Sequence, residues 1–155
     1  MAAFAAVAGI ALRASETIDA ALTGEAAIKA RKEAMKANSK DNKVIQAFVK
    51  DGKGSAADVV KAATDIAESS KKIPSLFPKG TGRGDFPDKT TRALPAIWKD
   101  WSGFEKAADT VVAEAEKLAA VAKEGDKDAI AKQAAALSKN GCGGCHKTYR
   151  GEKVK

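Results

Sequence analysis

From Gly24 onward, apolar or small residues recur every three or four positions, and no run of β-branched residues alternates with polar ones. This spacing is typical of amphipathic helices, because it places the apolar side chains on one face. Glycines and prolines divide the pattern into four segments. We expect helices over about residues 25–50, 55–73 and 96–123, and a fourth from residue 126 into the last twenty residues.

Each expected helix has an apolar stripe, and two have a clear start. Ser55 and Asp126 are placed to cap the second and fourth helices, while glycines end the first and third. The expected inward residues are Ile28, Met35, Ile45 and Val49 in the first helix, Val59, Ala63, Ile66, Ser70 and Ile73 in the second, Ile97, Trp101, Phe104, Ala108, Val111, Ala115 and Leu118 in the third, and Ile130, Ala134 and Leu137 in the fourth.

The segment from Pro74 to Pro95 holds all four prolines and three glycines, which excludes regular helix along its length. Two short connections and this long one predict an all-α fold, namely an antiparallel (up-down-up-down) four-helix bundle with a long Pro/Gly-rich crossover between helices 2 and 3. A loop of this length in a compact domain is usually functional or packed by its own side chains.

The composition indicates one domain with a thin core. The chain has 155 residues, of which 45% are hydrophobic but only 5% aromatic, and much of the apolar share is alanine. A core of this kind often packs around something larger than its own side chains, so a bulky cofactor is compatible with the composition.

The net charge of +7 does not by itself indicate a nucleic-acid partner. Basic and acidic residues are interspersed from Glu25 to the end, and no run of five or six basic residues occurs. We therefore expect a solvated helical surface and no nucleic-acid binding.

The first dozen residues are apolar but too few to span a bilayer as a helix, so we expect no stable membrane insertion. No basic residue precedes them, and Leu12-Arg13-Ala14 is a poor cleavage site. We interpret residues 1–20 as a truncated or atypical export signal and residues 21–155 as the folded domain.

Both cysteines and the only histidine lie within five positions, as Cys142-Gly-Gly-Cys145-His146. In this C-x-x-C-H arrangement, two thiols on one helical face can each add to a vinyl group of a haem. The adjacent histidine is then placed to bind the iron. The pattern predicts one covalent haem c, attached through Cys142 and Cys145, with His146 as the proximal axial ligand.

Three other interpretations use the same residues. A redox-active C-x-x-C is expected near a βαβ unit, and the sequence indicates no strands. Structural zinc needs four ligands, so a carboxylate would have to complete the set. A disulfide across two residues of a helix would be strained. We favour haem attachment over these alternatives.

Met35 is the candidate for the sixth position of the iron, because the chain has no second histidine and no other methionine except Met1. On the inward stripe it either binds the iron or packs over its distal face. Arg31, one turn earlier, and Arg150, one turn beyond His146, are candidates to bind the haem propionates or nearby carbonyls. Candidates to wall the ring, equally explained as core, are Phe77, Trp98, Trp101 and Tyr149.

Three stretches carry a family resemblance: IKARKEAM from Ile28, PAIWKDWSGFEKAA from Pro95, and the C-terminal CGGCHKTYR. Together they resemble the class II c-type cytochromes, which comprise cytochrome c′ and its low-spin, methionine-ligated relatives. The resemblance covers about residues 25–152 and implies a left-twisted antiparallel bundle, export to the bacterial periplasm and haem attachment there. The family's attachment, proximal, distal and arginine positions match Cys142, Cys145, His146, Met35, Arg31 and Arg150.

We expect a periplasmic electron carrier with His146 and Met35 bound to the iron. The small and amide residues around Met35, namely Ala34, Ala37 and Asn38, favour ligation. Enzymatic turnover is not expected, because no distal histidine or nucleophile-base grouping accompanies the motif. The expected partners are redox proteins, and a homodimer is left open. The alternative is a high-spin, five-coordinate cytochrome c′ that binds NO or CO, with Met35 only packing over the haem.

Overall fold

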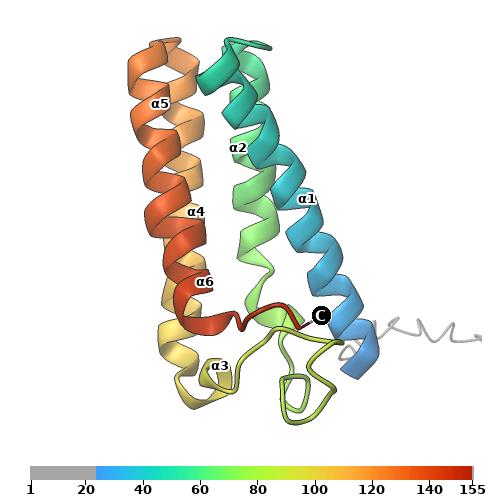
Figure 1. The fold of residues 1–155 in the computed structure, drawn as a ribbon. Coiled ribbons are helices and arrows are strands. Elements are labelled where there is room, and N and C mark those ends of the chain that lie inside the picture. Colours follow the sequence, from blue (N-terminus) through green and yellow to red (C-terminus); the bar gives the residue numbers. More distant parts are fainter. Residues whose placement is uncertain (1–23, 155) are drawn as a thin grey trace, which may run out of the picture.

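The computed structural model describes residues 24–154, which form an antiparallel four-helix bundle (Figure 1). The expected fold class is confirmed, and the expected export signal lies outside the described residues. Three parts make up the fourth helix of the bundle: α5, a π-helical stretch η2, and α6. The elements are α1 (Gly24–Asp51), α2 (Ala56–Lys71), α4 (Trp101–Glu124), α5 (Lys127–Ala136), η2 (Leu137–Gly143) and α6 (Gly144–Tyr149).

Side-chain caps fix where two of these helices begin. Ser55 accepts a hydrogen bond from the Asp58 backbone N–H, and the Asp58 carboxylate accepts one from the Ser55 N–H. Asp126 accepts two backbone hydrogen bonds at the start of α5. Gly125 ends α4 in the left-handed region, with φ of 78°, which a glycine adopts without steric cost. The two predicted caps are confirmed.

The third helix is not continuous, and the expectation of one helix over 96–123 is wrong at Asp100. A short α3 (Ala96–Lys99) ends there, and α4 begins at the next residue. Asp100 leaves the helical region, with φ of −129° and ψ of 64°, and its carboxylate accepts a hydrogen bond from the Gly103 N–H. It therefore acts as the N-cap of α4.

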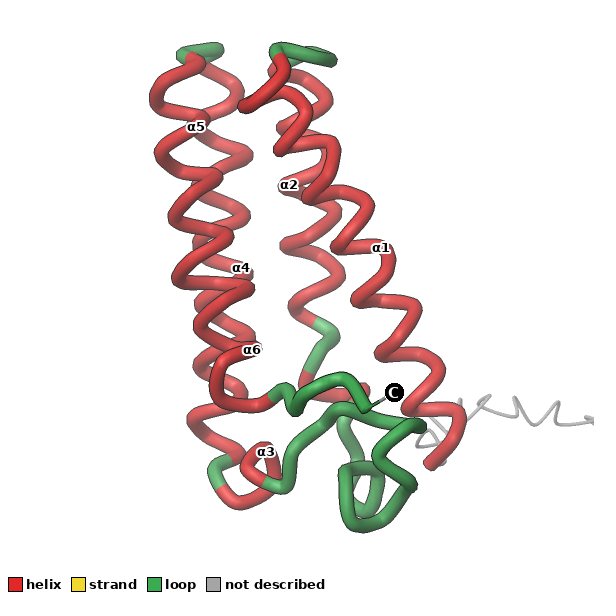
Figure 2. Tube along the Cα trace, viewed as in Figure 1, coloured by secondary structure: helices red, strands yellow, loops and turns green. Residues whose placement is uncertain are grey.

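The long crossover runs across the lower end of the bundle (Figure 2). After α2 it contains a single 3₁₀ turn, η1 (Pro74–Leu76), and then pairs with the chain that leaves α6. The Leu94 N–H donates to the Tyr149 carbonyl at 3.1 Å, and the Gly151 N–H donates to the Arg92 carbonyl at 2.7 Å. These bonds hold the crossover against the end of the fourth helix.

The core has two separate parts. The upper cluster lies between the four long helices, and seven of its fifteen buried residues are alanines, so the helices pack closely there. The lower cluster lies near the crossover and is mainly aromatic and aliphatic; its buried members are Ile73, Phe77, Ala93, Ile97, Phe104, Ala108 and Tyr149. The predicted inward residues belong to these clusters or pack partly buried against them. Ile28 and Ser70 belong to neither cluster, but both are buried as predicted.

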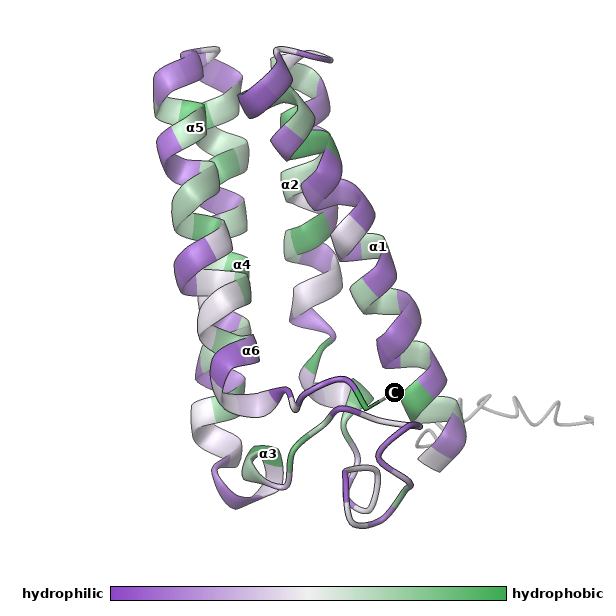
Figure 3. Ribbon diagram, viewed as in Figure 1, coloured by the Kyte–Doolittle hydropathy of each residue, from purple (hydrophilic) through white to green (hydrophobic). Residues whose placement is uncertain are grey.

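Polar residues cover the outward faces of the helices, while apolar residues lie mainly toward the bundle axis (Figure 3). Within residues 24–154, no helix combines the length and the hydropathy that a bilayer span requires.

The cap at Ser55 predicts a measurable stability change. Replacing Ser55 with Ala removes one half of the capping box and should lower the free energy of unfolding by about 1 kcal/mol. Urea denaturation followed by circular dichroism measures this change. Ser39→Ala, at an exposed position inside α1, is the matched control and should change stability little. Equal effects of the two substitutions would contradict the capping assignment.

Candidate functional site

The C-x-x-C-H motif begins inside the π-helical stretch and continues into α6. Turns of this wider kind are often found at functional sites. Gly141 and Gly143 suit the stretch because a side chain would be crowded at either position. A Cβ at Gly141 would lie 3.3 Å from the Val111 Cα, and one at Gly143 would lie 3.0 Å from the Ser138 carbonyl oxygen. The sequence pattern did not indicate this departure from α-helix.

Cys142 and Cys145 are both partly buried, form no disulfide with each other, and lie against different parts of the core. Cys142 packs on the upper cluster and Cys145 on the lower cluster. Burial raises the pKa of both thiols, and that of Cys145 reaches about 11, with a smaller contribution from Cys142. A redox-active C-x-x-C relies on a lowered thiol pKa, so this environment does not favour the thiol oxidoreductase interpretation.

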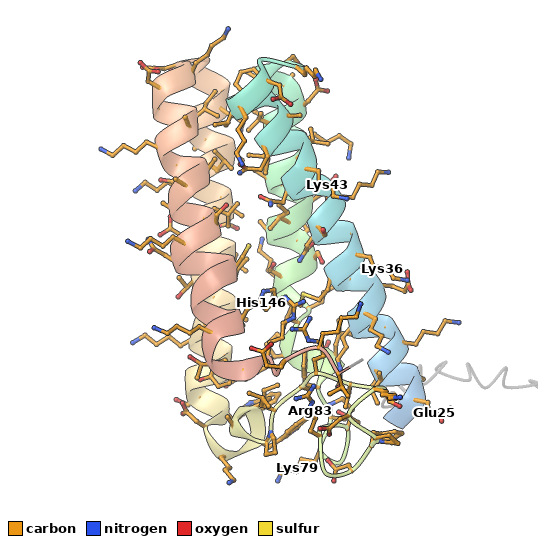
Figure 4. The ribbon with its side chains drawn as sticks, viewed as in Figure 1. Glu25, Lys36, Lys43, Lys79, Arg83 and His146 are labelled. Carbon is orange, nitrogen blue, oxygen red and sulfur yellow. The ribbon has the colours of Figure 1, made fainter. Side chains whose placement is uncertain are left out.

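His146 is half-buried on α6 (Figure 4). Burial lowers its pKa below the ordinary value, and the positive charges of Arg150 and Arg92 lower it further. The imidazole is therefore neutral near pH 7, which is the form that binds a metal. Among the described residues, no three histidine, cysteine or acidic side chains converge as a metal-ion site, so the zinc interpretation gains no support.

Met35 is half-buried on α1 and packs against the lower cluster, which is the cluster that Cys145 also contacts. The fold thus brings the predicted distal residue, on α1, and one attachment cysteine, on α6, to the same apolar region. One turn after Met35, the buried Asn38 Oδ1 has no hydrogen-bond partner among the described residues, and the same holds for the Ser70 hydroxyl of α2.

These features suit a large, mainly apolar cofactor. The core is divided at the level of the two cysteines, the imidazole is neutral, and one buried polar atom on each of α1 and α2 is without a partner among the described residues. Buried polar groups are normally satisfied, so an orphaned pair of this kind is expected where a bound group or water belongs. The residues present therefore fit a haem at this place.

Arg31 lies inside the fold, with only 5% of its surface exposed. Its guanidinium donates hydrogen bonds to the Thr81 hydroxyl at 2.8 Å, to the Thr81 carbonyl and to the Thr91 hydroxyl at 2.6 Å. It also lies over the Phe77 ring, 4.7 Å from the centroid. A carbonyl partner was one of the two roles expected from the sequence, and a contact with a propionate stays a prediction.

Arg150 is exposed at the end of α6, and its Nη1 lies 3.4 Å from the His146 Nδ1. Arg92 of the crossover lies nearby, because its Nε donates to the carbonyl of Gly151, the residue after Arg150. Its positive charge adds to the effect of burial in lowering the pKa of both His146 and Arg150. Sequence reasoning missed Arg92, since nothing in a proline- and glycine-rich loop indicates that it folds back to the C-terminal motif.

The lower cluster contains a group of aromatic side chains that contact one another. Phe104 lies at its centre, with ring centroids 4.9 Å from Phe77, 5.5 Å from Trp101 and 5.3 Å from Tyr149. Two polar atoms of the group are paired: the Trp98 indole donates to the Phe77 carbonyl and the Tyr149 hydroxyl donates to Asp100. The structure brings the predicted wall residues together, and Asp100 is a further member that the sequence did not indicate.

A four-helix bundle that carries C-x-x-C-H at the end of its fourth helix defines a haem-attaching bundle protein. Residues 26–150 match the family model described as Cytochrome C', and the chain belongs to this family. Members of the family carry one covalently bound haem c, so the cofactor expected from the sequence is confirmed.

Known relatives include two kinds of cytochrome. The chain is 33% identical over 126 residues to a cytochrome c′ of Pararhodospirillum photometricum, covering 81% of this chain and 97% of that protein. It is 35% identical over 95 residues to cytochrome c-556 of Agrobacterium tumefaciens, covering 61% and 71%. A solved cytochrome c′ described as having ligand-controlled dimer dissociation superposes with a TM-score of 0.74 at 28% identity, covering 84% and 98%.

The hydrogen bonds of Arg31 predict that its loss is costly. Arg31→Gln removes a charged donor from three buried acceptors and should lower the free energy of unfolding of the haem-loaded protein by about 3 kcal/mol. Chemical denaturation measures the loss. Lys32→Gln, at the exposed neighbouring position, removes the same charge and should have an effect within about 0.5 kcal/mol. A cost for Arg31→Gln as small as that of the control would exclude a structural role for these bonds.

Proposed function

We propose that this chain is an electron carrier whose haem c is attached through Cys142 and Cys145 and bound axially by His146 and Met35. The observation that carries the proposal is the packing of Met35 and Cys145 against one apolar cluster. The haem supplies an iron that cycles between ferric and ferrous states. A thioether ligand favours the ferrous state relative to a second nitrogen ligand and so raises the reduction potential.

The residues of the chain have distinct tasks in this proposal. The half-buried, neutral His146 offers a nitrogen lone pair without first losing a proton. The aromatic group around Phe104 excludes water and resists rearrangement. The surplus of positive charge favours weak, salt-sensitive docking of acidic redox partners. We assign the protein to the bacterial periplasm, which is the compartment expected from the sequence for haem c attachment. The bacterial origin of the relatives agrees with this assignment.

A second candidate function is binding of a small gas, NO or CO, at an iron that Met35 only shields. The name cytochrome c′ among the relatives favours it, as does the half-buried position of Met35. The solved relative with ligand-controlled dimer dissociation connects ligand binding to assembly in that protein. By analogy, if this chain binds a gas, we expect it to form a homodimer that dissociates more readily when the gas is bound.

The attachment residues are tested by mass spectrometry. Protein matured in a periplasm that attaches haem c should carry the added mass of one haem and no free thiol. Cys142→Ser and Cys145→Ser should each leave one thioether, and the double substitution should leave no covalent haem, because no other cysteine is present. Unmodified mass and two free thiols in the parent protein would exclude covalent attachment.

The axial role of Met35 is tested by absorption spectroscopy. With the thioether bound, the ferric protein should be low-spin and show a near-infrared sulfur-to-iron band. Met35→Leu keeps the apolar volume but removes the sulfur, so it should convert the iron to high spin and allow CO to bind the ferrous protein more readily. Val49→Ala, on the same helix but against the upper cluster, is the control and should keep the parent spectrum. A parent protein that is already high-spin favours the gas-binding candidate.

A further inference from the structure

Two arginines are held close to His146 by backbone pairing between the crossover and the chain after α6. The Gly151 N–H donates to the Arg92 carbonyl, and the Arg92 Nε donates to the Gly151 carbonyl, both at 2.7 Å. Ala93 and Arg150 form an isolated antiparallel bridge beside them. Both the backbone and the Nε of Arg92 are therefore held against Gly151, the residue after Arg150.

The charges of these arginines interact with each other and with the histidine. The Arg150 Nη1 is 3.4 Å from the His146 Nδ1. Burial lowers the pKa of Arg150, and the positive charge of Arg92 lowers it further. Two positive groups brought together beside a partly buried imidazole raise the free energy of the fold unless an anion compensates them.

No acidic side chain within residues 24–154 pairs with Arg92 or Arg150. Arg83 is the only arginine in that range with a salt bridge, at 3.8 Å from Asp88. Since Nε of Arg92 is already bonded, its two terminal nitrogens are left to bind a further acceptor. Arg31 differs, because three of its donors are already bound to Thr81 and Thr91.

We propose that Arg92 and Arg150 form a cationic pair that binds the propionate carboxylates of the haem beside His146. The inference rests on the proposed function in one respect, namely that the haem is attached at Cys142 and Cys145. A guanidinium recognises a carboxylate through two parallel N–H donors, and each propionate supplies such an acceptor. Arg31 acts through another group: it bonds to Thr91 and so positions the adjacent Arg92.

The pair should also influence the iron. Positive charge next to the propionates favours the ferrous state, so removal of either arginine should shift the redox equilibrium toward ferric iron by about tenfold, which is a fall of about 59 mV for one electron. The haem-loaded variants Arg92→Gln, Arg150→Gln and the double variant are compared by redox titration. Lys147→Gln, an exposed cation next to His146 in the chain, is the matched control.

A second measurement separates carboxylate binding from simple charge removal. The propionate bending bands of the resonance Raman spectrum should move in Arg92→Gln and Arg150→Gln and stay unchanged in Lys147→Gln. Arg92→Lys keeps the charge but loses the planar fork. Its reduction potential should therefore stay close to that of the parent protein, while its propionate bending bands should move as they do in Arg92→Gln. Arg150→Gln breaks no bond to the backbone, so it tests the pair even where Arg92→Gln weakens the fold.

The pair is rejected if both single variants match Lys147→Gln in potential and in the propionate bands. This outcome is separate from failure of the proposed axial ligands, which the spin state of the unsubstituted protein reports. A high-spin parent protein in which the arginine variants still shift the bands would reject Met35 as a ligand and keep the arginine pair.

Discussion

The buried guanidinium of Arg31 is the constraint on which the lower half of the fold depends. A charge at 5% exposure is costly unless hydrogen bonds replace its lost water, and burial lowers the pKa of Arg31 to about 10. No carboxylate among the described residues pairs with it. The crossover provides the compensation through Thr81 and Thr91, so a segment rich in prolines and glycines becomes ordered against α1.

The ordered crossover then connects the two helices that carry the predicted iron ligands. Thr91 contacts Arg31 on α1, and three residues later Leu94 donates to the end of α6. The distance between Met35 and His146 is therefore set partly by the loop, and not only by direct packing of the helices. This arrangement lets the lower cluster stay separate from the upper cluster, whose alanines hold the helices close together.

The sequence was sufficient for features that depend on near neighbours. Periodicity predicts the bundle and its inward residues, and a polar residue before a helical run predicts the caps at Ser55 and Asp126. The C-x-x-C-H spacing predicts the haem. Features that depend on distant contacts could not be predicted in this way. The break at Asp100 accompanies a hydrogen bond from Tyr149, and the partners of Arg31 lie 50 and 60 positions away.

The π-helical stretch shows how a local departure from periodicity serves the site. A regular helix that continued inward from Leu137 and Gly141 would turn Thr148 toward the core, because its stripe advances by 3.6 residues a turn. The structure instead buries Tyr149 and exposes Thr148. The wider turn advances the stripe by about one residue, which places Cys145 and Tyr149 on the lower cluster together and carries the tyrosine hydroxyl to Asp100. Successive residues of the resulting face are Ile130, Ala134, Leu137, Gly141, Cys145 and Tyr149.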